Sequence, residues 1–558
     1  MKLTSKKTLL FSTLAVSSYS VMANVIPDSG QLLQQQNIQP TLPKAELKIE
    51  TTQQMSNQLS DSEQQFHVKH IEIQGNESIH SDELNKIVQG SIDQDVSLAD
   101  LQKLTLDLTR YYQTQGYPYH RAYLPVQNLA DGQVVIGILE ARYDQIDYVN
   151  HTDLSDALIE NILAPLNSGD IISGEVLQQQ LMILNRLNGV KVRNVLSAGR
   201  YPGTSTLTVE VQPDQKLTGY IGLDNYGNEY TRELRLNAGL NVNNAFGLGD
   251  QLSLNAMTSG HLNFARLGYE ATVSGSGTRV GASYSELDYK LGKEYKALDA
   301  VGHAQQANVW VKQPIYLSNQ TEVVLGTQYD FKRMEDDIEV ADLYRHRDLH
   351  IGQINLNVTQ KDDFAGGGLT EFGVSSDFGY VKFNDAAAAK LDKATADTQG
   401  QFITAALNVS RLQNLGASST QLFTQVQAQY SPDNLDSAQQ FTVGGVSGVA
   451  GYENSVLSGS TGYYALAELK RELYGTGYQQ LSAKLFVDTA HVKRQAHKWR
   501  GLTGDNEDQI HSAGFGLNWA NRSKWSAALR VGFPIGPKPD SLNERNDVES
   551  WFSINKQF

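Results

Sequence analysis

Apolar and polar residues alternate through most of the chain from about 217 to 558. One run places apolar residues at every second position, Leu234, Leu236, Ala238, Leu240 and Val242, with Arg235, Asn237, Gly239 and Asn241 between them. A later run sets Thr424, Val426, Ala428 and Tyr430 against Gln425, Gln427 and Gln429. A period of two predicts β-strands that have one apolar and one polar face.

Strands of this kind need an apolar medium on one side and water on the other. A soluble sandwich meets that need by packing two sheets together, and a transmembrane barrel meets it by facing lipid. The run is too long for one sandwich, we find no helical insert in it, and residues 551–558 form a last strand that ends in an aromatic residue. A closed barrel satisfies every backbone group in lipid, so we predict an antiparallel barrel of about 16 strands over residues 214–558.

Composition agrees with a barrel and excludes several function classes. Hydrophobic residues make up 40% of the 558 residues, a soluble-looking average that a water-lined lumen also gives. The formal net charge of -15 argues against nucleic acid as a partner. The chain has no cysteine, which excludes disulfides, thiol nucleophiles and cysteine-ligated zinc.

Residues 1–23 have the pattern of a secretory signal peptide. Lysines at positions 2, 6 and 7 precede a short apolar core, and small residues before position 24 make Ala23 the predicted cleavage site. No later segment has the ~18 uninterrupted apolar residues of a spanning helix. We therefore expect an exported chain that enters the membrane as strands.

Two short segments follow the signal peptide. Over residues 24–36, an Asp/Ser start predicts a small polar helix that contains Gln31, Leu32, Leu33, Gln34 and Gln35. Residues 37–65 are rich in Gln, Pro, Thr and Ser, which is typical of a flexible linker. A disordered leader over 24–65 is the alternative, and the residues alone do not decide between the two.

Two small α+β units come next. Residues 66–141 predict the order β-α-α-β-β, and residues 142–213 repeat it. Edge strands in such units can accept an extended peptide by β-augmentation. Two tandem copies therefore favour a docking surface over a catalytic cleft.

Catalytic and metal-binding patterns are missing from the sequence. The histidines are scattered without metal-ligand spacing, for example His67, His70, His261, His303 and His491. Gly-rich stretches at 366–368 and 444–448 precede no helix and are not phosphate cradles. Asp336 and Asp337 are expected in a solvated loop. We predict no enzyme activity, no cofactor and no metal.

At this point the layout resembles the outer-membrane transporters of two-partner secretion, the TpsB family, whose small modules are called POTRA domains. Motifs that carry the resemblance occur in order along the chain, at 116–117 and 122–127, 184–189 and 203–207, 222–227 and 247–252. The resemblance implies a plug helix at 24–36, POTRA 1 at 66–141, POTRA 2 at 142–213 and a transmembrane barrel at 214–558.

The most specific stretch of the resemblance is 441–469. It implies a loop, around 441–462, that folds into the barrel lumen and ends in the tip Val449, Ala450, Gly451 and Tyr452. In the family the tip carries an Arg, which pairs with the Asp of a Phe-x-Asp motif, here Phe486 and Asp488. Ala450 stands at the Arg position, which leaves Asp488 without its expected cation. Asp488 either remains solvated in the lumen or, if it is half-buried, needs another donor, and the sequence does not decide between the two. The tip would then rely on a turn at Gly451 and on packing of Tyr452.

The resemblance also implies a function. A large partner exoprotein would dock through its N-terminal secretion domain on periplasmic POTRA domains and cross the outer membrane through the pore without ATP. The last strand, with Phe552, Ile554 and Phe558 on one face, would be the signal for the barrel-assembly machinery. Lys556 shares that face, and we expect it to extend towards the lipid headgroups. The chain is expected to be a monomer.

Two other function classes remain open from the residues. A barrel-protein insertase would also carry such modules, usually more of them, and a passive porin or adhesin would not need two docking modules. The sequence leaves the partner unidentified: a haemolysin, an adhesin and a contact-dependent toxin are all compatible with it.

Overall fold

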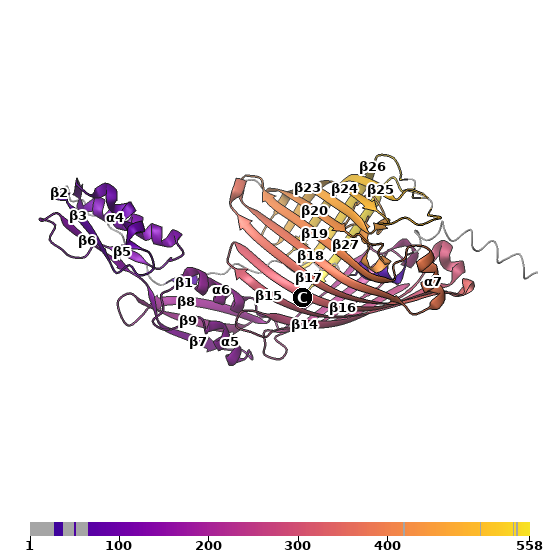
Figure 1. Cartoon of the computed structure of the whole chain (residues 1–558), viewed down its shortest axis with the longest axis horizontal. Coiled ribbons are helices and arrows are strands. Elements are labelled where there is room, and N and C mark those ends of the chain that lie inside the picture. Colours follow the sequence, from indigo (N-terminus) through magenta and orange to yellow (C-terminus); the bar gives the residue numbers. More distant parts are fainter. Residues whose placement is uncertain are drawn as a thin grey trace, which may run out of the picture.

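The computed structural model describes residues 27–36, 49–51, 65–416, 419–502, 504–539, 541–542 and 545–558. The predicted signal peptide with Ala23, and most of the predicted linker, lie outside these ranges. Figure 1 shows two small α+β units in line at one end of a large barrel.

The first unit, POTRA 1, is built around the three-stranded sheet β3-β6-β5 and a separate β2-β4 pair. Its elements are β2 (Gln65–Val68), β3 (His70–Gln74), α3 (Ser81–Val88), η1 (Gln89–Ser91), β4 (Gln94–Ser97), α4 (Leu98–Thr114), β5 (Arg121–Tyr123) and β6 (Gln133–Leu139). Helix α4 begins with a capping box between Ser97 and Asp100. Its Leu101 and Leu108 pack on the sheet residue Ile136 and form the core of the unit.

The second unit, POTRA 2, has the sheet order β1-β8-β9-β7 under two helices. Its elements are β7 (Arg142–Asn150), α5 (Asp156–Leu163), α6 (Gly174–Asn185), β8 (Val190–Ala198), β9 (Thr204–Pro213) and, from the preceding segment, β1 (Ile49–Thr51). Strand β1 pairs in parallel with β8, and Glu50 lies opposite Val195. Three residues of the predicted linker therefore add a strand to the edge of POTRA 2.

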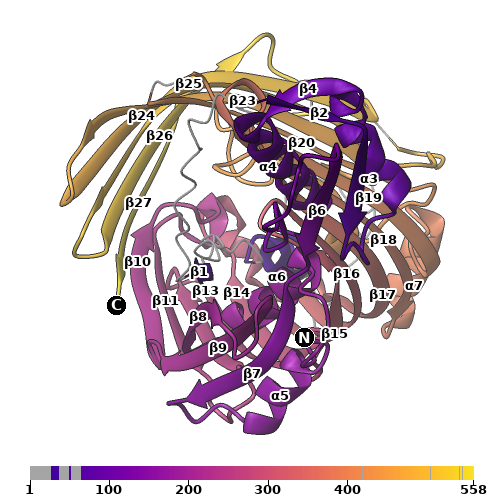
Figure 2. The same ribbon diagram turned by 90° about the vertical axis from the view of Figure 1, so that its left-hand side faces the viewer.

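The C-terminal part is a closed antiparallel barrel of 16 strands, as predicted. Its strands are β10 (Leu217–Asp224), β11 (Arg235–Asn243), β12 (Gln251–Thr258), β13 (Leu262–Thr272), β14 (Arg279–Lys290), β15 (Ala300–Leu317), β16 (Thr321–Ile338), β17 (Leu343–Asp362), β18 (Gly368–Phe383), β19 (Gly400–Asn414), β20 (Thr420–Tyr430), β23 (Thr461–Gly475), β24 (Gln479–Lys493), β25 (Glu507–Asn521), β26 (Trp525–Ile535) and β27 (Glu549–Gln557). Strand β10 pairs with β27 from Tyr220 opposite Gln557 to Asp224 opposite Ser553, which closes the ring. Figure 2 shows this ring from the POTRA end.

The two faces of the barrel strands differ as the alternation predicts. Val426 and Tyr430 of β20 are 44% and 61% exposed on the outer face. Gln429, between them in sequence, turns inward and donates to the backbone oxygens of Gln439 and Ser460. The lumen therefore receives the polar face.

One expectation about the barrel is wrong, because a helix does interrupt the strands. Helix α7 (Ala386–Ala394) lies between β18 and β19. Asp385 accepts hydrogen bonds from the backbone N–H groups of Ala387 and Ala388, and a run of alanines follows it. An Asp cap before alanines favours a helix, and this local signal is not visible in the period-two pattern of the flanking strands.

POTRA 2 is joined firmly to the barrel. Arg186 binds both carboxylate oxygens of Glu322, which lies in β16, and its Nη2 is 2.7 Å from Oε2. The N–H of Asn188 donates to the carbonyl of Gly249 at 3.1 Å, and Leu317 joins the POTRA 2 core. These contacts fix the second unit to the turns at that end of the barrel.

The two POTRA units meet through fewer contacts. The N–H of Gly174 donates to the carbonyl of Gly116 at 2.9 Å, and Arg142 pairs with Glu77.

No helix in the described ranges is long and apolar enough to cross a membrane.

Candidate functional site

Helix α2 (Ser29–Gln34) lies inside the barrel, against the inner face of the wall. Asp28 caps it by accepting a 3.1 Å hydrogen bond from the N–H of Gln31. Leu32 and Leu33 are 0% and 2% exposed, in one apolar cluster with the wall residues Leu349 and Ile351. Burial of these side chains holds the helix in the lumen.

The glutamines of the helix face the segment 431–460, the loop that follows β20. Gln31 donates to Ser458, Gln34 to the carbonyl of Ser437 and Gln35 to Ser455, at 3.4, 3.3 and 2.9 Å. The helix thus binds the wall with its leucines and the loop with its amides, which accounts for the mixed Gln/Leu composition.

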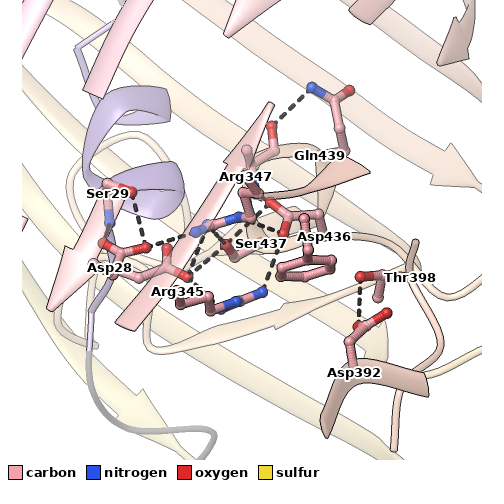
Figure 3. A network of polar contacts seen from close by, with 12 residues as sticks. Asp28, Ser29, Arg345, Arg347, Asp392, Thr398, Asp436, Ser437 and Gln439 are labelled. Carbon is pink, nitrogen blue, oxygen red and sulfur yellow. Dashed lines mark hydrogen bonds and ion pairs between the residues drawn. The ribbon is translucent and has the colours of Figure 1, made fainter. Parts of the chain in front are cut away.

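A buried ionic network fastens the start of the helix (Figure 3). Arg347 of β17 is 0% exposed and contacts Asp336 and Asp436 at 2.6 Å and Asp28 at 3.4 Å. Arg345 links Asp28 and Asp436 at 3.2 and 3.0 Å. Buried charges persist only when they are paired and hydrogen-bonded, and this network joins the helix, the wall and the loop.

The expectation that Asp336 lies in a solvated loop is wrong. It belongs to β16 (Thr321–Ile338), faces the lumen, and accepts hydrogen bonds from the N–H and hydroxyl of Ser29 at 2.8 and 3.0 Å. Asp337 is also a β16 residue and pairs with His346. The register that sets Asp336 opposite Arg345 would have indicated the pairing, but a single sequence does not give it.

The loop contains η6 (Ser437–Gln439), β21 (Phe441–Val443) and β22 (Leu457–Gly459), and its tip lies on the wall formed by β24 to β27. The N–H of Ala450 donates to Asp488 Oδ2 at 3.1 Å, and the N–H of Gly451 donates to Ser512 Oγ at 3.0 Å. Trp551 Nε1 donates to the carbonyl of Ala450 at 2.8 Å. Val449 and Tyr452 are buried beside them. The structure brings the four predicted tip residues, Phe486 and Asp488 into one cluster.

Of the two alternatives for Asp488, the structure shows the buried carboxylate with another donor. Asp488 is 4% exposed and accepts from Ser512 Oγ. Arg530 of β26 places its Nη2 3.4 Å from Asp488 Oδ2, and its guanidinium lies 3.9 Å from the ring centre of Phe486. Sequence reasoning missed Arg530, since only the register of β24 to β26 brings it to Asp488.

The last strand presents its aromatic face outward. Phe552, Ile554 and Phe558 are 36%, 45% and 46% exposed on the barrel surface. Lys556 donates to the carbonyl of Ser523 and lies 5.8 Å from the ring centre of Trp525. Its amine therefore caps the neighbouring turn beside an aromatic ring.

One group of possible metal ligands comes together on the outer face of the barrel. His303 of β15 lies 2.7 Å from Asp288 through Nδ1 and 3.4 Å from Glu286 through Nε2. No metal-ligand spacing is visible in the sequence because the three residues come from two strands. Each imidazole nitrogen already faces a carboxylate, so ion pairing accounts for the group.

A groove of about 520 Å³ lies on POTRA 1 between β3 and α3. It is lined by residues 70–73 of the strand, by Ser81, Asp82, Asn85 and Lys86 of the helix, and by Gln89 and Ile92. In the described residues β3 pairs on one side only, with β6, so its other edge faces this groove. An extended peptide could add to that edge.

Comparisons with known proteins agree with this architecture. A family model described as haemolysin secretion/activation protein ShlB/FhaC/HecB matches residues 203–518, more than half of the chain, and a ShlB-type POTRA domain model matches residues 66–141. The heme/hemopexin transporter protein HuxB from Haemophilus influenzae is 26% identical over 97% of this chain and 97% of that protein. The hemolysin transporter protein ShlB from Serratia marcescens is 24% identical over 75% and 74%.

The fold is also found in a solved structure. CdiB from Escherichia coli superposes with a TM-score of 0.72 at 22% identity, and the match covers 91% of this chain and 93% of that one. The family matches place the barrel in the outer membrane and the POTRA domains in the periplasm. The chain belongs to the ShlB/FhaC/HecB family of haemolysin secretion/activation proteins, the outer-membrane transporters of two-partner secretion.

Proposed function

We propose that the chain secretes one large partner exoprotein by letting it replace the plug helix in the barrel lumen. The proposal is supported by how the lumen is filled in the described residues. Helix α2 and the loop 431–460 contact the inner face of the wall, and neither of them belongs to the strand pairing of the barrel. Removing the helix exposes apolar wall residues such as Leu349 and Ile351 but breaks no strand pairing. The barrel can therefore open without losing its backbone hydrogen bonds.

The secretion domain of the partner docks first on POTRA 1. The groove between β3 and α3 offers an unpaired strand edge, which gives main-chain hydrogen bonds to any extended segment, and side-chain pockets that select among segments. In POTRA 2 the strand that corresponds to β3 is β7, which pairs with β9, whereas the opposite edge of that sheet, at β8, is already occupied by β1. A segment that docks at β8 must displace β1, and β1 belongs to the chain segment that leads back to the plug.

Plug release breaks the ionic network at Asp28. Arg345 and Arg347 keep Asp436 as a partner when Asp28 leaves, and Arg347 also keeps Asp336, so the two guanidinium groups remain paired. The loop tip has separate anchors on the opposite wall, namely Asp488, Ser512 and Trp551. Helix exit and loop movement are therefore separable steps.

The loop tip depends on a cation in the wall. Arg530 supplies the positive charge beside Asp488 that the Ala450 side chain cannot supply. Gly451 lies against the wall, where an added Cβ would be 2.7 Å from the Cβ of Ser512. We infer that a glycine at this position lets the loop backbone approach the wall closely. Tyr452 contributes its buried ring.

The relatives give only a starting point for identifying the partner. The relative that matches over 97% of the chain is titled a heme/hemopexin transporter, so a haem- or hemopexin-related exoprotein is the first partner to test, before haemolysins, adhesins and contact-dependent toxins.

We further propose that the barrel-assembly machinery recognises Phe552, Ile554 and Phe558, and that the transporter acts as a monomer without ATP, a cofactor or a metal.

Surface delivery tests the function. The large exoprotein candidate is expressed with and without this chain, and its appearance at the cell surface is measured together with the total content of outer-membrane barrel proteins. Loss of that exoprotein from the surface with other barrels unchanged is the expected result. A general loss of barrels would show an insertase instead and would overturn the proposal.

A further inference from the structure

A row of side-chain amides follows the inner face of β17 below the plug helix. Gln353, Asn355 and Asn357 continue the face that begins with Leu349 and Ile351, the residues that pack against the plug. Because the side chains of a strand return to the same face every second residue, the amides repeat about every 6.8 Å towards the periplasmic end. The row thus leads from the POTRA side up to the plug.

The amides are linked head to tail. Asn357 Nδ2 donates to Asn355 Oδ1 at 2.9 Å, Asn355 Nδ2 donates to Gln353 Oε1 at 3.2 Å, and Gln353 Nε2 donates to Asp377 Oδ1 at 2.8 Å. An ionised carboxylate only accepts, so Asp377 fixes the orientation of all three amides. Each of the three amides donates one of its two N–H groups in these bonds, and the oxygens of Gln353 and Asn355 each accept one bond. Every amide therefore keeps one N–H and at least one oxygen lone pair for a ligand.

Small residues flank the row and leave it accessible. Gly326 of β16 and Ser375 of β18 lie opposite Asn355, and Gly373 lies opposite Asn357. A Cβ at position 326 would be 2.4 Å from Asn355 Oδ1, and a Cβ at 373 would be 3.1 Å from Asn357 Oδ1. Larger residues at the glycine positions would displace the amides, so the glycines give the amides room to lie against the wall. Gln353 and Asn355 are half-buried and Asn357 is exposed.

We propose that this amide row binds the backbone of the partner polypeptide while it passes the barrel in extended form. One edge of an extended chain presents an N–H and a C=O at every second residue, with the same ~6.8 Å repeat as the amides. Each amide can donate to the passing carbonyl and accept from the passing N–H. Backbone groups are common to all residue types, so the recognition is independent of sequence and neutral in charge, as a long and varied cargo requires.

The inference rests on the proposed function for its natural ligand, but its test does not. The chain has no cysteine, so Ser375→Cys gives the full-length protein a single thiol beside Asn355, which accepts a nitroxide. Quenching of a fluorophore on a short Gly/Ser/Thr peptide then reports binding at the row from the periplasmic side. A second peptide of the same sequence carries N-methyl groups on alternate backbone nitrogens and has lost the N–H donors of one edge.

We expect the unmethylated peptide to bind about tenfold more tightly than the methylated one, as the loss of one or two net hydrogen bonds predicts. The variant Gln353→Met, Asn355→Leu, Asn357→Leu keeps side-chain size and removes the amides, so the two peptides should bind it equally. Gln360→Met, on the outer face of the same strand, is the matched control and should keep the difference. The single variant Asn355→Leu gives a reduced difference if the triple variant fails to fold.

Equal quenching by the two peptides on the unaltered row would overturn the proposal. So would a difference that survives the triple substitution. A failure of the surface-delivery experiment would instead withdraw the secretion function and leave the peptide result to be judged on its own, because quenching does not require transport.

Discussion

Arg530 and Asp488 form an ion pair on the inner wall beneath the loop tip, with 3.4 Å between Nη2 and Oδ2. The pair lies within the wall, between β26 and β24, while the loop contributes only the backbone N–H of Ala450 to the same carboxylate. The positive charge that the family resemblance places on the loop is therefore supplied by the wall in this chain. Binding of the loop then depends on a carboxylate that Arg530 and Ser512 hold in place on the wall.

The first prediction is that Arg530→Ala loosens the loop tip although the loop itself is unchanged. Loss of a charge-assisted partner from a largely buried carboxylate should weaken docking of the tip by roughly 2 kcal/mol. Hydrogen exchange of peptides that span 445–455 in the full-length protein should then become faster by about thirtyfold. The added substitution Ala450→Arg should restore slow exchange, because the position above Phe486 has become vacant.

The control for this prediction is Ala450→Arg alone. It brings a second guanidinium to a site that already holds one, so it should loosen the tip. Slow exchange in Arg530→Ala, or no rescue in the double variant, would show that Arg530 does not support the tip.

The second prediction concerns the plug helix. Leu32→Asp places a carboxylate in the apolar cluster with Leu349 and Ile351, at a cost of roughly 3 kcal/mol or more, and should release the helix. Conductance of the full-length protein in planar bilayers should increase several-fold. Gln36→Asp is the control, because this residue follows the helix and its side chain bonds only to the carbonyl of Leu32 in the described residues. Equal conductance of the two variants would contradict plugging by the leucine face.

Features of the fold and of the site that depend on local sequence pattern could be predicted from the sequence. The period of two gave the barrel and its two faces, and the Asp/Ser start indicated the short helix α2, whose role as a plug is implied by the family resemblance. The tip residues and Asp488 could be named because the family resemblance rests on local motifs at these positions. Arg530, Asp336 and Arg347 could not, since their partners are set by strand register and by the docking of segments far apart in the chain. Strand β1 was missed for the same reason, because its pairing lies in POTRA 2 and not in its own composition.

The third prediction is that Arg186 and Glu322 act as a pair that holds POTRA 2 on the barrel. Their side chains are 21% and 29% exposed and meet through two hydrogen bonds, a geometry in which a charge reversal leaves two like charges together. Arg186→Glu and Glu322→Arg should each reduce secretion and raise hydrogen exchange around 247–250. The double reversal should recover most of both losses.

A surface ion pair gives the matched control for the reversals. Arg110 pairs with Asp107 on α4 and is 72% exposed, so Arg110→Glu should change neither secretion nor exchange at 247–250. If the double reversal is no better than the single ones, the contact does not determine how POTRA 2 is held.

The last prediction concerns acid sensitivity of POTRA 1 and rests on His120. This side chain is 0% exposed, neither ring nitrogen has a hydrogen-bond partner in the described residues, and its ring lies 5.5 and 4.8 Å from the ring centres of Tyr112 and Tyr117. Burial lowers the pKa of His120 to about 4, while the nearby Glu140 opposes and Arg142 adds to the shift. The folded unit therefore holds the imidazole neutral at neutral pH.

The sign of the effect follows from proton binding. In the unfolded chain His120 takes up a proton near pH 6.5, and in the folded chain it does so only near pH 4, so the unfolded state binds more protons between these values. Stability should therefore be full above pH 6.5 and fall by up to about 2 kcal/mol on acidification to pH 5.

Hydrogen exchange of residues 98–139 in the full-length protein should become faster at pH 5 than at pH 7, after correction for the intrinsic rate. His120→Phe should remove most of this difference, whereas His67→Phe, at an exposed position, should not. An unchanged pH dependence in His120→Phe would assign the sensitivity to groups other than this imidazole.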